Sequence, residues 1–155
     1  MKKTVVLLAM LALVAGFAAA QEEVDLAPGF MPDPYEVVID AYVGDTTTIS
    51  PDGMSEIEVF FDSSAPHVVL FWDSEGSGDL YIEFISEGSV DPVLIMVGPD
   101  GEEYSNDDYS GLDPAIVIES APGGEYNIGV GAWSETEILG TLYISELGFS
   151  SDMGM

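Results

Sequence analysis

Apolar runs of strand length, separated by Gly, Pro, Asp and Ser, recur through most of this 155-residue sequence. None of them shows the periodicity of an amphipathic helix, and several alternate between two faces. In one run, L-Y-I-E-F-I, Leu80, Ile82 and Phe84 share one face of the expected strand, and Tyr81 and Glu83 share the other. The sequence therefore predicts an all-β chain.

Nine segments have the length and composition of strands: Tyr35–Tyr42, Thr46–Ile49, Glu56–Phe61, His67–Trp72, Leu80–Ile85, Val93–Val97, Ala115–Glu119, Tyr126–Ala132 and Thr141–Glu146. Besides Leu80, Ile82 and Phe84, the alternation predicts six core-facing side chains: Ile57, Val59, Phe61, Tyr126, Ile128 and Val130. Strands at this spacing predict an antiparallel β-sandwich of about 8–9 strands. A closed barrel is the alternative.

The first 20 residues have the composition of a secretory signal peptide. Lys2 and Lys3 precede an apolar run that ends at Phe17, and three alanines precede Gln21. We expect cleavage before Gln21 and a secreted product, extracellular or periplasmic. An uncleaved membrane anchor is the alternative, although the apolar run is short for a membrane span.

The remaining 135 residues are enough for one domain with a single core. Residues 21–34 are acidic and rich in Pro, and we expect them to form an exposed leader, either a linker or an edge, and not a packed element. We assign residues 35–147 to the sandwich and residues 148–155 to a flexible tail. The sequence contains no Cys, so no disulfide can form and core burial must supply the stability.

Charge restricts the partners of this chain. All 29 acidic residues follow residue 20, whereas Lys2 and Lys3 are the only basic residues, so signal cleavage takes the formal charge from −27 to −29. Such a chain repels phosphate backbones and anionic lipids, and we expect neither nucleic acid nor membrane as a partner after cleavage. The charge favours a cationic partner, metal ions or a high-salt medium, and it also serves plain solubility.

The segment Asp91–Asp113 surrounds one apolar strand with carboxylates. The turn Gly98–Gly101 predicts a hairpin, which returns the chain to the end of the strand where Asp91 lies. Calcium requires six to eight oxygen ligands, and the loop at that end offers a candidate set: Asp91, Asn106, Asp107, Asp108 and Asp113. The alternative is a solvated loop whose acidic side chains cap turns.

Aromatic side chains form a second candidate surface. Trp72, Tyr104, Tyr109 and Trp133 have the chemistry to stack against sugar rings or partner side chains. Packing in the core or at its rim is the alternative for each of them. His67 is the only histidine, and no nucleophile motif accompanies it, so we expect a structural role for it.

The order of motifs in the second half of the chain resembles the bacterial pre-peptidase C-terminal domain. These motifs are D-P-V-L-I-M-V-G-P-D-G, S-N-D-D, L-D-P-A-I, A-P-G-G-E-Y-N-I-G-V-G-A-W and T-L-Y-I-S-E, between Pro66 and Glu146. The resemblance implies a secreted β-sandwich of jelly-roll type that is associated with adhesion and, in some members, with calcium. Members commonly accompany a protease, whereas here we expect the domain to stand alone.

These observations favour a non-catalytic β-sandwich that binds or adheres to an extracellular protein, polysaccharide or cationic partner, with calcium as the expected ion. A self-associating component of an extracellular layer, joined through edge strands, is the alternative. A hydrolase ranks last, because no pair of carboxylates stands out in the sequence.

Overall fold

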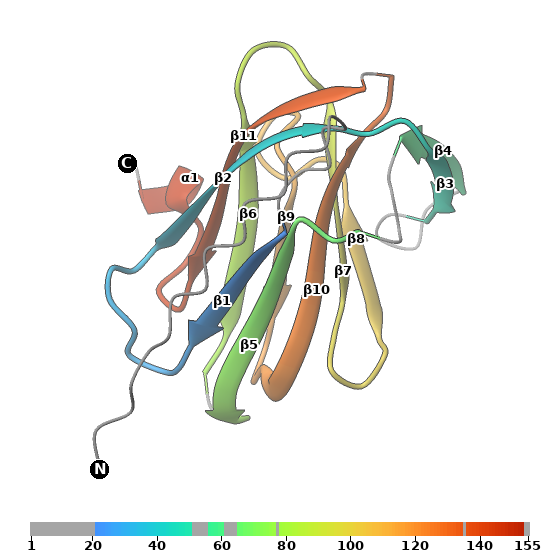
Figure 1. The fold of residues 1–155 in the computed structure, drawn as a ribbon. Coiled ribbons are helices and arrows are strands. Elements are labelled where there is room, and N and C mark those ends of the chain that lie inside the picture. Colours follow the sequence, from blue (N-terminus) through green and yellow to red (C-terminus); the bar gives the residue numbers. More distant parts are fainter. Residues whose placement is uncertain (1–20, 51–55, 61–64, 77, 135, 154–155) are drawn as a thin grey trace, which may run out of the picture.

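The structure is a computed structural model that describes residues 21–50, 56–60, 65–76, 78–134 and 136–153. Within these ranges the chain forms 11 strands and one short helix (Figure 1): β1 (Glu22–Leu26), β2 (Tyr35–Tyr42), β3 (Thr46–Ile49), β4 (Ile57–Phe60), β5 (Val68–Glu75), β6 (Leu80–Ser86), β7 (Pro92–Val97), β8 (Glu103–Asn106), β9 (Ala115–Ile118), β10 (Pro122–Ala132), β11 (Glu137–Ser145) and α1 (Ser150–Met153).

The strands form two sheets that pack against each other. Sheet A has the order β1-β5-β10-β4-β3, and β7 also pairs with β10 and carries β8 on its other side. Sheet B has the order β2-β11-β6-β9. The pairings are antiparallel except for β1 with β5. The predicted all-β sandwich is confirmed, with 11 described strands instead of 8–9.

The core lies between the sheets and is filled by the faces that alternation predicts. Leu80, Ile82 and Phe84 of sheet B are fully buried, and so are Ile128 and Val130 of sheet A. Each such side chain contributes about 1.5–3 kcal/mol through removal of apolar surface from water. Tyr126 and Val59 are buried as well. The side chain of Ile57 and all of Phe61 lie outside what the structure describes.

The predicted leader is wrong for Glu22–Leu26. This segment forms β1, which pairs in parallel with β5, and Val24 and Leu26 are buried in the core. The segment is short, acidic and next to a Pro-rich stretch, so its two inward apolar residues give little signal. Burial against β5 decides its conformation.

The predicted flexible tail is also wrong for its first part. Phe149 and Ser150 are buried, and α1 packs on the outer face of sheet B. The Phe149 and Tyr81 rings meet edge-on, with centroids 5.2 Å apart. The backbone N–H of Ser151 donates to Oε2 of Glu83 (3.2 Å), and Glu83, predicted to face outward, is only 1% exposed because α1 covers it.

His67 has a structural role, as expected. It is buried just before β5, and its Nδ1 accepts a hydrogen bond from the backbone N–H of Val130 (3.0 Å). This bond ties the start of β5 to β10. Among the described residues, no helix is long and apolar enough to span a bilayer.

Candidate functional site

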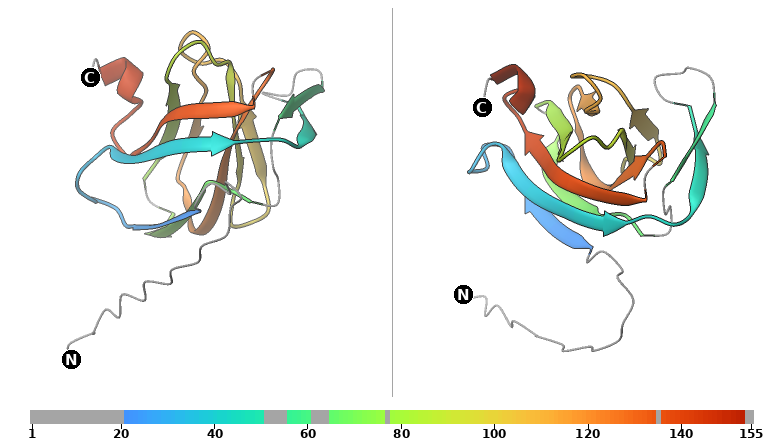
Figure 2. Two further views of the ribbon diagram at one scale, coloured as in Figure 1. Left: turned by 45° about the horizontal axis from the view of Figure 1, so that its top comes forward. Right: turned by 90° about the horizontal axis from the view of Figure 1, so that it is seen from above.

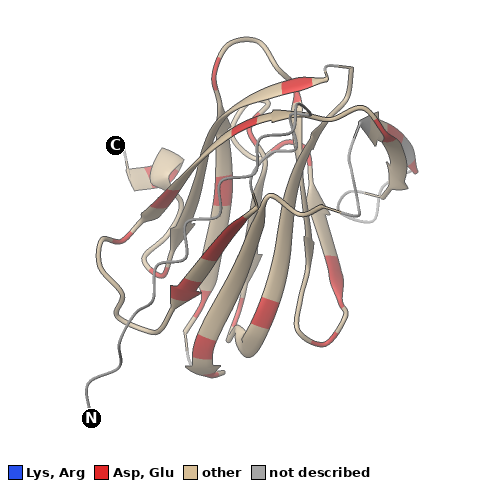
Figure 3. Ribbon diagram, viewed as in Figure 1, with Lys and Arg blue, Asp and Glu red and all other residues tan. Residues whose placement is uncertain are grey.

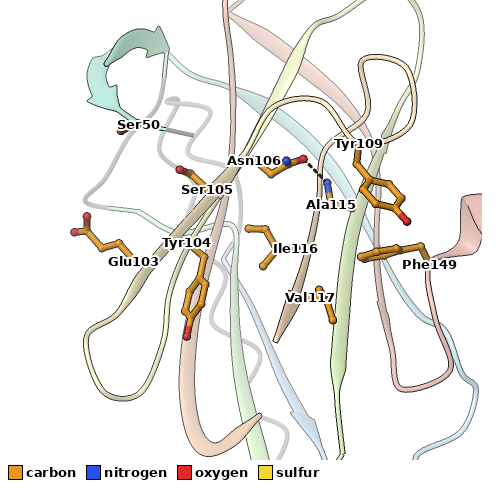
Figure 4. Close-up of a pocket in the computed structure, with 10 residues that line it drawn as sticks. All are labelled: Ser50, Glu103, Tyr104, Ser105, Asn106, Tyr109, Ala115, Ile116, Val117 and Phe149. Atoms are coloured by element: carbon orange, nitrogen blue, oxygen red, sulfur yellow. Dashed lines mark hydrogen bonds between the residues drawn. The ribbon is translucent and has the colours of Figure 1, made fainter. Parts of the chain in front are cut away.

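A groove lies between the free edges of the two sheets. Among the described strands, β8 pairs only with β7 at the edge of sheet A, and β9 pairs only with β6 at the edge of sheet B. The groove has a volume of about 460 Å³, within the usual range for small-molecule sites (Figure 4). It is lined by Ser50, Glu103, Tyr104, Ser105, Asn106, Tyr109, Ala115, Ile116, Val117 and Phe149.

One end of the groove is formed by the rings of Tyr109 and Phe149, whose centroids lie 4.5 Å apart (Figure 4). The Tyr109 hydroxyl donates to Oδ2 of Asp152 in α1 (2.9 Å). This hydrogen bond is the main cause that raises the pKa of Tyr109 above its ordinary value. The ring is therefore fixed between the β8–β9 loop and α1, and its hydroxyl is protonated at neutral pH.

Tyr104 supplies a third ring from β8. Its hydroxyl donates to Oε2 of Glu102 (3.0 Å), and burial, followed by this hydrogen bond, raises the pKa of Tyr104 to about 12. A Cβ placed on Gly98 would lie 3.4 Å from the Tyr104 ring and 3.6 Å from that of Tyr126, so the two tyrosines flank the same backbone position. The Tyr104 ring is thus held against the core side of the groove.

One buried hydrogen bond joins the two strand edges that border the groove. The side-chain Oδ1 of Asn106, at the end of β8, accepts from the backbone N–H of Ala115, at the start of β9 (2.9 Å; Figure 4). Asn106 and Ala115 are both buried. This bond ties the edge of sheet A to the edge of sheet B across the loop 107–114.

Ionisation of Tyr126, which lies behind Tyr104, should destabilise the fold at alkaline pH. It is 1% exposed, its hydroxyl donates to the carbonyl of Pro122 (2.7 Å), and burial raises its pKa to about 12. Since an unfolded tyrosine ionises near pH 10, the stability from neutral Tyr126 is complete below pH 10 and is lost as the pH rises toward 12. We expect the free energy of unfolding to fall by roughly 2 kcal/mol from this residue over that range.

Urea denaturation at pH 9, 10, 11 and 12, with Tyr126→Phe as comparison, measures this loss. The Phe variant keeps the ring and should show a smaller alkaline decrease than the unmodified protein. Tyr42→Phe, which alters a tyrosine that is 64% exposed, should leave the decrease unchanged. An identical decrease in the Tyr126→Phe variant would contradict the assignment.

The structure confirms the predicted hairpin and places its acidic residues along the connection between the sheets. β7 and β8 pair antiparallel, with Leu94 opposite Asn106, so Asp91 and the loop after Asn106 lie toward the same end. The backbone carbonyl of Asp91 accepts from Trp133 N (3.1 Å). Asp107 is buried and Asp108 is exposed.

Asp113 turns toward sheet B. Its Oδ1 accepts from both the backbone N–H (2.9 Å) and the hydroxyl (2.8 Å) of Ser86. Its backbone forms a small turn with Tyr109 and Ser110. Asp113 and Asn106 therefore use side-chain oxygens to hold the loop, which supports the turn-capping interpretation for these two residues.

Calcium stays a prediction. Across the described ranges, the structure brings no three His, Cys, Asp or Glu side chains together in a group of the kind that holds a metal ion. Two residues of the predicted set, Asn106 and Asp113, already accept backbone hydrogen bonds through their side-chain oxygens.

The four predicted aromatic residues separate into different places. Tyr104 and Tyr109 line the groove, whereas Trp72 is 2% exposed and packs in the core edge-on against Phe30, so its assignment to a binding surface is wrong. Trp133 is 39% exposed, just after β10, and does not line the groove. The sequence prediction missed Phe149, although a lone Phe followed by Ser-Ser-Asp resembles a helix start.

The groove carries no positive charge. Lys and Arg are absent from the residues that the structure describes, and carboxylates are spread over both sheets (Figure 3). Among the groove-lining side chains, Glu103 is the acid, and Ser105, Asn106 and the tyrosines supply neutral polar atoms. Such a lining suits a neutral or cationic ligand with an apolar face. Compared with models of known protein families and with curated proteins, the chain matches none.

Proposed function

We propose that the protein is a secreted, non-catalytic binding module that holds a neutral polysaccharide segment in the groove between β8 and β9. The observation that carries the proposal is the pair of partly exposed rings, Tyr104 and Tyr109, that line one groove, with the buried ring of Phe149 packed against Tyr109. Neutral sugar rings present apolar C–H faces to aromatic side chains and hydroxyls to polar ones. A polysaccharide also avoids the repulsion that this acidic chain exerts on anionic ligands.

The lining of the groove supports binding without catalysis. Glycoside hydrolysis commonly uses two carboxyl groups about 5–10 Å apart on either side of the scissile bond. Glu103 is the acid among the lining residues, and it is exposed on β8. His67 is buried elsewhere and already accepts a hydrogen bond from Val130 N.

Isothermal titration calorimetry with a panel of neutral tetrasaccharides tests this proposal. We expect at least one member to bind, and Tyr109→Ala to weaken its binding by about tenfold or more, since a stacked ring contributes about 1 kcal/mol beyond its buried area. Tyr104→Ala should also weaken it. Tyr42→Ala removes an exposed tyrosine outside the groove and should bind like the unmodified protein.

Two results would contradict the proposal. The first is no binding by any neutral saccharide of the panel. The second is equal binding by the Tyr109→Ala and Tyr42→Ala variants, which would place the saccharide outside the groove.

A further inference from the structure

The outer face of sheet B is apolar along part of its length and is covered only in part. On this face Val38 is 70% exposed, Tyr42 is 64% exposed and Leu139 is 37% exposed, and Ile85 and Thr141 are half-buried. We name these five residues the outer-face patch. In the pairing register Val38 lies opposite Thr141, which in turn lies opposite Ile85, so three neighbouring strands contribute to one row.

Leu139 connects the two most exposed members of the patch. It lies opposite Asp40 on β2, and it is therefore diagonal to both Val38 and Tyr42. Diagonal neighbours of this kind lie within reach of one another on a sheet. With strands about 4.8 Å apart and a rise of about 3.4 Å per residue, the patch measures roughly 10 by 13 Å.

One end of the outer face of sheet B is covered by the C-terminal segment of the chain. α1 lies beyond one end of β2 and β11 (Figure 2), and there Phe149 packs on Tyr81 and Ser150 is buried. The outer-face patch lies toward the opposite end, where Tyr42 pairs with Glu137. The sheet surface is thus of a kind that packs against an amphipathic segment, and the outer-face patch has no such cover from the described residues.

Carboxylates lie within and around the patch: Asp40 lies between Val38 and Tyr42 on the same face of β2, opposite Leu139. Glu36 and Asp40 flank Val38 on β2, Glu137 lies opposite Tyr42, and the backbone N–H of Glu87 donates to Leu139 O (2.8 Å). All four acids are exposed. No Lys or Arg among the described residues neutralises them. A second copy of this chain would bring the same acids face to face, and like charges in register are destabilising.

We propose that the outer-face patch docks a basic amphipathic segment of a partner protein. Its apolar side chains and the methylene stems of its Lys or Arg pack on Val38 and Leu139, and the cationic heads reach Asp40 and Glu137. This site is separate from the groove between β8 and β9, on which it does not depend. The small area fits a weak, transient complex.

The test uses three labelled 14-residue peptides and fluorescence anisotropy. The first has Lys and Leu at helical spacing, the second replaces each Leu by Ser, and the third replaces each Lys by Glu. We expect the Lys–Leu peptide to bind most tightly, the Lys–Ser peptide at least about fivefold more weakly, and the Glu–Leu peptide not at all. Binding should weaken between 50 mM and 500 mM NaCl.

Variants locate the binding on the surface. The double variant Val38→Ser, Leu139→Ser should bind the Lys–Leu peptide at least about tenfold more weakly and no longer distinguish it from the Lys–Ser peptide. Leu112→Ser changes an aliphatic residue, 51% exposed, in the loop before β9 and outside both the groove lining and the outer-face patch, and should bind normally. Asp40→Asn with Glu137→Gln, which leaves the apolar surface intact, should weaken binding severalfold and reduce its salt dependence.

Three outcomes overturn the proposal. Equal binding by the Val38→Ser, Leu139→Ser variant and the unmodified protein would mean general attraction to an acidic chain. A similar loss in Leu112→Ser would place the peptide outside the outer-face patch. A dimer in sedimentation that the double variant dissociates would make the outer-face patch a contact between copies instead.

Discussion

Replacing Trp72 by Ala should lower the free energy of unfolding by about 3–5 kcal/mol, the largest loss that we expect from a single core substitution. Trp72 lies in β5, is 2% exposed and packs edge-on against Phe30, with ring centroids 6.3 Å apart. Truncation leaves a cavity between β5 and the segment after β1, and the paired strands on either side limit how far the site can collapse. Urea denaturation followed by far-UV circular dichroism measures the change.

The indole N–H of Trp72 sharpens this prediction. It is buried and has no hydrogen-bond partner among the described residues, so the substitution removes packing but no hydrogen bond. Trp72→Phe should therefore cost less than half as much as Trp72→Ala, because it retains a ring and removes an unsatisfied donor.

Trp133→Ala is the matched control, since it deletes the same side chain at a site that is 39% exposed. The bond from the Trp133 backbone N–H to Asp91 O survives this change. We expect a loss of less than about 1 kcal/mol. If the loss of stability in Trp72→Ala were as small as that expected for Trp133→Ala, Trp72 would not be a core residue.

Gly140→Ala should cost about 3 kcal/mol, at the upper end of the usual range for overpacking. Gly140 lies in β11 between β2 and β6, and a Cβ there would lie 2.4 Å from the backbone oxygen of Ile85 and 2.5 Å from the Phe84 ring. Neither neighbour can retreat, because the oxygen belongs to the sheet backbone and Phe84 is fully buried. The central strand pair of sheet B must therefore separate locally.

The control for this substitution is Gly44→Ala. Its Cβ would meet only a Tyr42 ring carbon, at 3.4 Å, and its φ lies outside the left-handed region. We expect a change within about 0.5 kcal/mol, of either sign, since Ala also restricts the unfolded chain. Thermal melting of both variants compares them, and an equal effect at the two positions would contradict the close approach at Gly140.

The alternation of apolar and polar residues was sufficient to predict most strands, because a strand that buries one face has an apolar residue at every second position. β2 and β3 have the predicted bounds, and the alternation of Leu80, Ile82 and Phe84 correctly identified core positions. This alternation was insufficient where the conformation or burial of a segment depends on contact with a part of the chain that is distant in sequence. β1 is explained by pairing with β5, and the burial of Glu83 by the packing of α1.

The sequence also predicted only part of the candidate site. Tyr104 and Tyr109 were chosen for their chemistry and do line the groove, whereas Trp72 has the same chemistry and is buried in the core. Sequence gives the residue type, but the side chain's neighbours depend on which strand edges remain unpaired. Phe149 joins the groove only because the chain after β11 folds back over sheet B.

By itself, the sequence determined the all-β class, the hairpin of β7 and β8, and the absence of basic residues after Lys3, because periodicity, turn chemistry and charge are local properties. Only the tertiary structure decided that β8 and β9 face each other across a groove, that α1 covers one end of sheet B and leaves Val38 and Leu139 exposed, and that Trp72 is buried. These outcomes depend on contacts between residues far apart in the chain, and such contacts leave no periodic mark on the segments that make them.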